Sequence, residues 1–213
     1  MNTETSISTE EAILMAARKV FELKGFDGAR MQEISDRARI NRALLHYYFR
    51  TKEKMFERIF DEALERFMPL LSTWDQDLEE CWEWKLKRFI ITFITFLKTN
   101  SMLFLLREII RKPELLASKT KKYRKGLNKF VLYFDRLKQE RLIRSDVDSR
   151  YIYVIIHSLC SFPLMNGIVF SYSLRISPKE YDELMTGYPE IISDLLIQSL
   201  KYQKTEKSIN ENE

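Results

Sequence analysis

The 213-residue chain is 45% hydrophobic and 13% aromatic, which is ample for a packed core. Its formal net charge of +4 is too small to indicate nucleic-acid binding by itself, and Cys81 and Cys160 match no metal or disulfide spacing. Only five Gly and five Pro, with few alternating strand patterns, favour an all-α fold. The polar N-terminus lacks the basic start and apolar core of a secretory signal, so we expect a reduced, cytoplasmic setting.

The first predicted helix runs from Ser8 to Lys24. Ser8 and Glu11 have the spacing of a capping box, in which each side chain binds the other residue's backbone N–H. An apolar stripe follows at helical period: Ile13, Leu14, Ala17, Val20 and Phe21. We expect Gly25 to end this helix, which should pack behind the next two and close a three-helix domain.

Residues 25–54 predict two short helices joined by a tight turn and followed at once by a longer helix. Ile34 and Ala38 lie four apart on one face of the first, and Ile40 lies in the turn. Leu45 and Tyr48 lie three apart on the inner face of the second. This is the spacing of a helix-turn-helix.

The second short helix is expected to begin at Asn41, whose side-chain oxygen can accept a hydrogen bond from an orphan backbone N–H one or two residues on. Its outward face carries Arg42, Ala43, His46 and Tyr47. The segment is also locally basic, because residues 30–54 hold seven Lys and Arg against three Asp and Glu. Together these features predict a DNA-reading helix.

The pattern GFxGAxxxxIxxxAxINxxLLxYYFxTKEKMF resembles the N-terminal domain of the TetR family of bacterial transcriptional regulators. Two positions depart from the family pattern. Arg39 stands where a turn glycine is usual, and Leu44 stands where a small or hydroxyl residue is common. Arg39 either adopts a left-handed backbone, at a cost of ~1 kcal/mol, or the turn is rearranged. An operator sequence therefore cannot be copied from a relative.

The resemblance implies DNA contacts along this segment. Arg42 can make a bidentate contact to guanine O6 and N7, with a phosphate clamp as the alternative. Asn41 opens the reading helix, and base edges are expected near Gln32, Ala43 and Tyr47. Phosphate contacts are expected from Arg30, His46, Tyr48 and Lys52.

The rest of the chain predicts a helical bundle. It follows the three-helix DNA-binding domain, which we call the reader, without a linker. Helices are expected over residues 51–74, 77–100, 102–112 and 115–142, then after Ser177-Pro178 and again from Pro189. The predicted fold is all-α, with about nine or ten helices. It comprises a three-helix DNA-binding domain (residues 1–51), a continuous effector-binding and dimerisation domain (52–204) and a disordered tail (205–213).

Residues 151–174 carry no charged side chain, and their length alone would permit a membrane span. Scattered polar residues such as His157 and Asn166 favour the buried core of a dimer instead. We expect a homodimer formed through about residues 148–174 and 189–203. In the last helix the residues expected to face a partner are Ile191, Ile192, Leu195, Leu196 and Leu200.

Aromatic residues are abundant in the predicted bundle. Each is first of all a core residue, but the family resemblance implies an apolar cavity for a small molecule among them. The candidate effector residues are Phe93, Phe96, Phe104, Arg107, Glu108, Tyr123, Phe130, Phe134 and His157. Arg107 and Glu108 fit either an ion pair or polar anchors of an effector. His157 and Cys160 are too few for a metal site, so we expect no metal and no cofactor, and a hydrogen-bonded His157.

The resemblance implies a cytoplasmic, homodimeric regulator that binds double-stranded DNA, most simply a repressor. A small apolar or amphipathic effector would release it from a palindromic operator. The alternative is an activator, or a dimeric DNA-binding protein that senses no effector. An enzyme is disfavoured, because the chain has no GxSxG, no phosphate-cradling glycine loop and no HExxH. Nothing in the sequence specifies the operator, the target genes or the effector.

Overall fold

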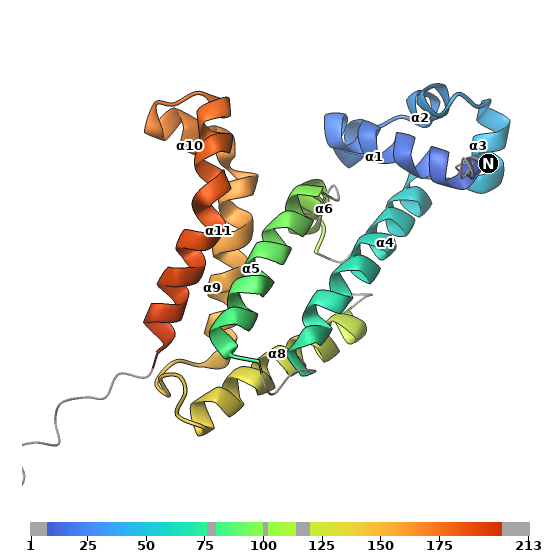
Figure 1. The fold of residues 1–213 in the computed structure, drawn as a ribbon. Helices are drawn as coiled ribbons and strands as arrows, with labels where there is room; N and C mark the ends of the chain where they lie inside the picture. The colour runs from blue at the N-terminus through green and yellow to red at the C-terminus, as the bar shows by residue number, and fades with distance from the viewer. Residues whose placement is uncertain (1–7, 76–79, 100–101, 114–119, 202–213) are drawn as a thin grey trace, which may run out of the picture. The chain divides into compact units, whose positions relative to one another are not determined.

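The computed structural model describes residues 8–75, 80–99, 102–113 and 120–201. These residues form ten α-helices and one short 3-10 helix, and their only β-pairing is an isolated bridge between Ile143 and Lys201 (Figure 1). The predicted all-α class is confirmed. The elements are α1 (Thr9–Gly28), α2 (Met31–Ala38), α3 (Arg42–Tyr48), α4 (Lys52–Ser72), η1 (Thr73–Asp75), α5 (Trp82–Thr99), α6 (Met102–Arg111), α8 (Thr120–Gln139), α9 (Ser149–Met165), α10 (Gly167–Leu174) and α11 (Pro178–Leu200).

The chain divides into two compact units, each of which is described by itself. Unit 1 comprises residues 1–67 and 97–119, and unit 2 comprises residues 68–96 and 120–213. Unit 1 therefore holds α1 to α3, most of α4 and all of α6. Unit 2 holds η1, most of α5, and α8 to α11.

Helix α1 begins as predicted but ends differently. Ser8 Oγ accepts from the Glu11 N–H at 3.2 Å and Glu11 Oε2 accepts from the Ser8 N–H at 3.0 Å, which completes the capping box. The prediction that the helix ends at Gly25 is confirmed only in part, since the helical geometry breaks there but α1 extends to Gly28. Gly25 makes a kink, with φ 71° and ψ 171°, and the chain resumes a last helical turn through Gly28. A residue without a Cβ adopts this positive φ with little strain.

Four phenylalanines form the aromatic core of unit 1. The rings of Phe21 and Phe104 stack with centroids 5.9 Å apart, and Phe56 meets them edge-on at 6.0 and 5.9 Å. Phe26, just after the kink, packs edge-on against Phe56 at 5.2 Å. This cluster joins α1, α4 and α6, so the three helices share one core.

Trp74 is the centre of the unit 2 core. Its ring centroid lies 5.0 Å from those of Phe89 and Phe130, 5.1 Å from Tyr133 and 5.5 Å from Phe134. All five side chains are buried. Aromatic rings at these separations interact favourably beyond their burial, so η1, α5 and α8 are held together here.

The uncharged segment is two helices, not one. α9 ends at Met165 and α10 begins at Gly167, with a bend of 74° between them. Among the described helices, none alone has the length and apolar character needed to cross a membrane. Two bent pairs, α5 with α6 and α9 with α10, reach those limits only when each pair is taken together.

Two tyrosines of α11 satisfy carbonyls that α9 leaves open. Pro163 lies inside α9 and has no N–H to donate to the Leu159 carbonyl four residues earlier. The Tyr188 hydroxyl donates to that carbonyl at 3.0 Å, and the Tyr181 hydroxyl donates to the Pro163 carbonyl at 3.1 Å, near the end of the helix. Burial raises the pKa of both phenols, so both remain protonated donors.

The final helix corrects two predictions. α11 is continuous from Pro178 to Leu200, so Pro189 does not begin a new helix. The capping box of Ser177 and Glu180 and the buried residues on both sides of Pro189 outweigh the hydrogen bond that proline removes. Of the residues expected to face a partner, Ile192, Leu196 and Leu200 are buried within the chain, whereas Ile191 and Leu195 are exposed.

The other helix bounds need smaller corrections. α5 begins at Trp82, since Glu80 and Cys81 are not helical, and α8 ends at Gln139. α4 contains Pro69, whose ring removes one backbone hydrogen bond from a helix expected to be uninterrupted. Residues 77–79, 100, 115–119 and 205–213, on which other parts of the predictions fall, lie outside the described residues.

Candidate nucleic-acid interface

Helices α2 and α3 are anchored by two buried side chains. Ile34 of α2 and Leu45 of α3 are completely buried, as the helical spacing predicts. Tyr48, expected on the same inner face as Leu45, is 39% exposed. Its ring meets that of Tyr47, which is also exposed, edge-on at 5.5 Å.

The turn between the helices takes the strained form anticipated for Arg39. This residue has φ 57° and ψ 40°, a left-handed conformation that ends α2. The Arg39 N–H donates to the Asp36 carbonyl at 3.2 Å, and the Ile40 N–H donates to the Ser35 carbonyl at 3.1 Å. These bonds satisfy the last carbonyls of α2 and fix the turn without a glycine.

Asn41 caps the reading helix, but its side chain binds an N–H three residues on, not one or two residues on as predicted. Its Oδ1 accepts from the Leu44 N–H at 2.7 Å, and its carbonyl accepts from the Leu45 N–H at 3.2 Å. An N-cap of this kind stabilises a helix by ~1 kcal/mol. For a helix as short as Arg42–Tyr48, the cap fixes where the outward side chains begin.

The outward face of α3 is open to solvent. Arg42, Ala43, His46 and Tyr47 are all exposed, Tyr47 to 81%. Arg42 Nε donates to His46 Nε2 at 3.4 Å, one helical turn away. This long contact is weak, so the Arg42 guanidinium can leave it for a partner with better geometry.

The residues predicted on α2 are also accessible. Arg30, the N-cap residue of α2, and Gln32 are exposed. Gln32 Nε2 donates to Asp36 Oδ1 at 2.8 Å along the helix. The structure therefore leaves the predicted roles of both side chains open to test.

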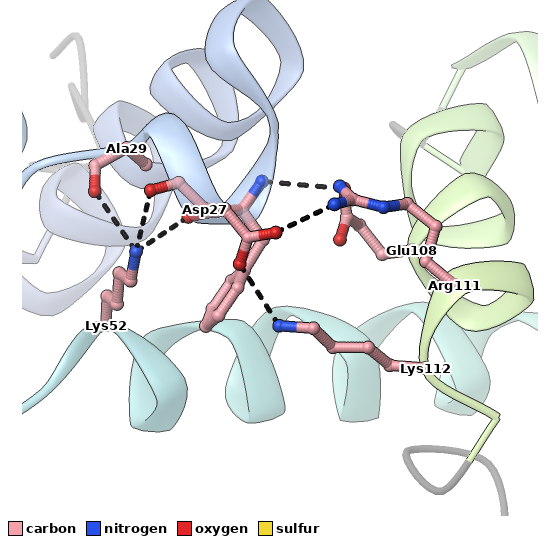
Figure 2. A network of polar contacts seen from close by, with 7 residues as sticks. Asp27, Ala29, Lys52, Glu108, Arg111 and Lys112 are labelled. Atoms are coloured by element: carbon pink, nitrogen blue, oxygen red, sulfur yellow. Dashed lines mark hydrogen bonds and ion pairs between the residues drawn. The ribbon is translucent and has the colours of Figure 1, made fainter.

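Lys52 differs from the other predicted phosphate contacts. Its ammonium donates to the backbone carbonyls of Phe26 at 2.9 Å, Asp27 at 3.2 Å and Ala29 at 3.4 Å (Figure 2). It also lies 4.7 Å from the centroid of the Phe26 ring. An ammonium has three protons, and here each faces an acceptor within the protein. This geometry favours a role in holding the end of α1, in place of the expected phosphate contact.

Helix α6 binds the same end of α1 through charged side chains. Arg111 Nη2 and Lys112 Nζ reach the two Asp27 carboxylate oxygens at 2.8 and 3.2 Å (Figure 2). Hydrogen bonding to Lys112, with the charges of Lys112 and Arg111, holds the pKa of Asp27 below its ordinary value. Asp27, Arg111 and Lys112 were missed by sequence analysis, because ion pairs between residues more than eighty positions apart leave no local pattern.

Glu108 is buried beside this contact. Its Oε1 accepts from the Phe26 N–H at 3.5 Å, the first amide after the Gly25 kink, and from Arg111 Nη1 at 3.4 Å. Its Oε2 is buried and accepts no hydrogen bond from the described residues. Arg107, by contrast, is exposed. Glu108 thus stabilises the contact of α6 with α1.

The predicted effector residues fall in both units. Phe104, Arg107 and Glu108 belong to unit 1, and the side chain of Tyr123 lies outside the described ones. In unit 2 the completely buried Phe130 and Phe134 pack against Trp74 and are core residues. Phe93 and Phe96 are also buried.

His157 is half-buried among aromatic rings of unit 2. Its centroid lies 5.6 Å from that of Phe93 and 5.9 Å from that of Tyr153. Burial lowers its pKa and raises the pKa of the Cys160 thiol to about 12, which opposes the thiolate that a metal would need. Contrary to expectation, the imidazole makes no hydrogen bond with another described residue.

A three-residue turn joins α2 to α3, each helix is held by one buried apolar side chain, and α3 is capped and exposed. These features define a helix-turn-helix DNA-binding protein. Residues 13–59 match the family profile described as bacterial regulatory proteins, tetR family. These residues therefore form a DNA-binding domain of the TetR type, as found in DNA-binding transcriptional regulators.

The chain is similar to relatives along most of its length. It is 28% identical to the HTH-type transcriptional repressor NicS of Pseudomonas putida over 91% of this chain and 92% of that protein. It is 34% identical to the probable HTH-type transcriptional regulator YttP of Bacillus subtilis, over 32% of each chain.

Solved structures share the fold. The fatty acid degradation regulator FadR of Bacillus halodurans matches with a TM-score of 0.67 and 18% identity, covering 92% of this chain and 97% of that one. The hemolysin II transcriptional regulator HlyIIR matches with a TM-score of 0.64 and 22% identity, covering 92% and 98%.

Proposed function

We propose that the protein is a cytoplasmic homodimeric repressor that binds a palindromic operator and leaves it when a small apolar or amphipathic effector binds. The observation that carries this proposal is the exposed face of α3, where Arg42 directly follows the Asn41 cap. Side chains at the N-terminal end of a recognition helix are the ones that reach base edges in the major groove. A relative named as a repressor favours repression over activation.

Dimerisation is supported by the apolar surface of α9, α10 and α11. Large hydrophobic side chains on these helices are exposed in the single chain: Tyr151, Val154, Ile155, Phe162, Ile168, Val169, Tyr172, Leu174, Leu184, Ile191 and Leu195. An exposed apolar surface of this extent is typical of an interface. A two-fold dimer would place two reading helices in major grooves separated by roughly 34 to 36 Å or a multiple of it.

The effector is expected to contact the aromatic surroundings of His157. Phe93 and Tyr153 offer apolar surface beside an imidazole whose hydrogen-bonding atoms remain available. Neutral imidazole, favoured by the lowered pKa, can donate or accept one hydrogen bond from an amphipathic ligand. This arrangement suits an uncharged polar group on a mainly apolar molecule.

Coupling to the reader would use α6 and its contact with α1. Glu108, Arg111 and Lys112 of this segment bind the last turn of α1, the helix that packs on α2. A displacement of α6 would therefore strain the support of the reader itself. A hundredfold release from DNA requires a coupling free energy of ~2.7 kcal/mol, within the ordinary range.

Footprinting of the purified protein on its own promoter region tests the proposal. We expect protection of two half-sites related by two-fold symmetry and a dimer by light scattering. Protection of a single half-site by a monomer would contradict the proposal. A thermal-shift screen of hydrophobic cations, fatty acids, bile acids and flavonoids then separates it from the effector-independent alternative, which predicts no hit that also releases DNA.

A further inference from the structure

Unit 1 contains a cavity that neither the DNA-reading face nor the aromatic surroundings of His157 includes. Its volume is about 530 Å³, within the range of small-molecule sites. One wall is α1, from Ala12 to Lys19, and another is the C-terminal end of α2 with Arg39 of the turn. Arg66 of α4 and Thr99 of α5 complete the lining.

The cavity is strongly cationic. Five of its ten lining residues are basic, and none is acidic; the five are Arg18, Lys19, Arg37, Arg39 and Arg66. Two of them form ion pairs with carboxylates outside the lining. Arg18 binds Glu62, and Lys19 Nζ lies 3.1 Å from Glu22 Oε2.

Arg37 and Arg39 differ from Arg18 and Lys19 in having no ion pair with a described residue. Neither side chain makes an ion pair or hydrogen bond with any other residue of the described part of the chain, and both are exposed. Arg39 also has a left-handed backbone at the turn that contributes to the lining. Two guanidinium groups that face a common space without counter-charges favour an anion, which each can bind through two parallel N–H groups.

Apart from Thr99, the rest of the lining is apolar. Ala12, Met15, Ala16 and Ala38 present only methyl, methylene and thioether groups beside the five cations. A free inorganic ion would leave this surface in contact with water, whereas an aliphatic or aromatic body would cover it. The combination therefore matches a molecule with one anionic group and a short apolar body.

We propose that this cavity binds a small amphipathic organic anion, a carboxylate or a phosphate monoester, with Arg37 and Arg39 on its charged group. The bound anion would bridge α1 and the turn that precedes the Asn41 cap, and so stabilise unit 1. The site is separate from the effector site proposed at His157. Its existence does not depend on repression, dimerisation or an effector.

Calorimetric titration of the full chain tests this at fixed ionic strength. The probes are octanoate and octyl phosphate, used below their micellar concentrations. The controls are 1-octanol, which has the alkyl chain without a charge, and inorganic phosphate, which has the charge without an alkyl chain. We expect at least one amphipathic anion to bind at least tenfold more tightly than both controls. The tighter of the two identifies the head group that the site prefers.

A double variant locates the site. Arg37→Gln with Arg39→Asn removes both guanidinium groups, and asparagine tolerates the left-handed backbone. We expect this variant to bind the preferred probe at least tenfold more weakly. Arg124→Gln with Lys125→Gln is the matched control, since it removes the same charge from exposed residues of unit 2 and should leave the affinity unchanged.

Three results would overturn the proposal. Equal affinities in the two double variants would place the probe elsewhere, such as beside His157. Inorganic phosphate binding as tightly as octyl phosphate would indicate an adventitious ion only. Absence of binding by either anion, with weaker binding of random duplex DNA by the Arg37 and Arg39 variant, would assign these arginines to the DNA backbone.

Discussion

The outward faces of α3 and α11 are both exposed in the single chain, but they have opposite chemistry. α3 presents Arg42, His46 and Tyr47, whereas α11 presents Leu184, Ile191 and Leu195. Charged and hydrogen-bonding groups suit phosphates and base edges, while aliphatic groups suit a second protein surface. The chemistry of the side chains therefore indicates which kind of partner each exposed face would bind.

The two faces are also supported differently. α3 has only seven residues, and its position depends on the Asn41 cap and the Arg39 turn. α11 has 23 residues and buries a full side of its surface against its own unit, including Met185 and Ile192. Substitutions on the α11 face should leave the subunit folded, whereas substitutions that support α3 should disturb the reader.

The strongest test of this contrast is Leu195→Asp. Leu195 is 65% exposed, so the charge should not unfold the subunit but should separate the proposed dimer. Operator affinity should then fall by about a hundredfold, or ~2.7 kcal/mol, because a monomer engages one half-site. Light scattering and fluorescence anisotropy with the footprinted operator measure the two effects.

Leu132→Asp is the matched control for that substitution. Leu132 lies on α8 in the same unit and is 67% exposed, yet it is outside the proposed interface. It should remain dimeric with normal operator affinity. If the two variants had the same oligomeric state and the same operator affinity, Leu195 would not belong to a dimer interface.

The second prediction concerns the support of the reader. Lys52→Met keeps the aliphatic stem but removes three hydrogen bonds to the end of α1. Loss of these charge-assisted bonds should lower the free energy of unfolding by ~1.5 to 3 kcal/mol. Lys54→Met, which removes only the exposed pair with Glu57, should cost less than ~0.5 kcal/mol.

Urea unfolding of both lysine variants, followed by circular dichroism, provides the measurement. If the Lys52→Met protein stayed stable but bound every duplex more weakly, this result would support the phosphate contact that the sequence predicts.

Sequence predicted the reader well because its determinants are local. The caps at Ser8 and Asn41 each involve residues three positions apart, and the left-handed Arg39 is one of the two turn forms that the sequence left open. Buried anchors such as Ile34 and Leu45 follow from helical period. Each of these features is decided by its neighbours along the chain.

Sequence failed where distant residues decide the outcome. Pro189 is an ordinary helix start by local rules, but packing on both sides keeps α11 continuous. Glu108 binds an amide 82 residues away, and the Asp27 contacts are equally remote. The effector residues stay a prediction, because an aromatic residue of the core and one beside a ligand have the same local pattern.

Arg42→Ala tests the polar face of α3 directly. If Arg42 reads guanine, the variant should lose ~1 to 3 kcal/mol of discrimination between the operator and a duplex altered at that base pair. Binding to random duplex should change little. Competition anisotropy with the two duplexes provides the measurement, and an equal loss on both would make Arg42 a phosphate clamp instead.

The smallest expected effect is that of Arg39→Gly. Arg39 is one of three arginines with a positive φ among the described residues, all at 57°, and glycine adopts this conformation without a Cβ clash. Relief of the clash should exceed the added entropy of the unfolded chain and stabilise unit 1 by roughly 0.5 kcal/mol. Arg175→Gly should stabilise unit 2 by a similar amount, since its φ and ψ are nearly the same. The two variants differ in DNA binding: only Arg39 adjoins the cap of α3, so operator affinity should change in Arg39→Gly alone if the turn positions the reader.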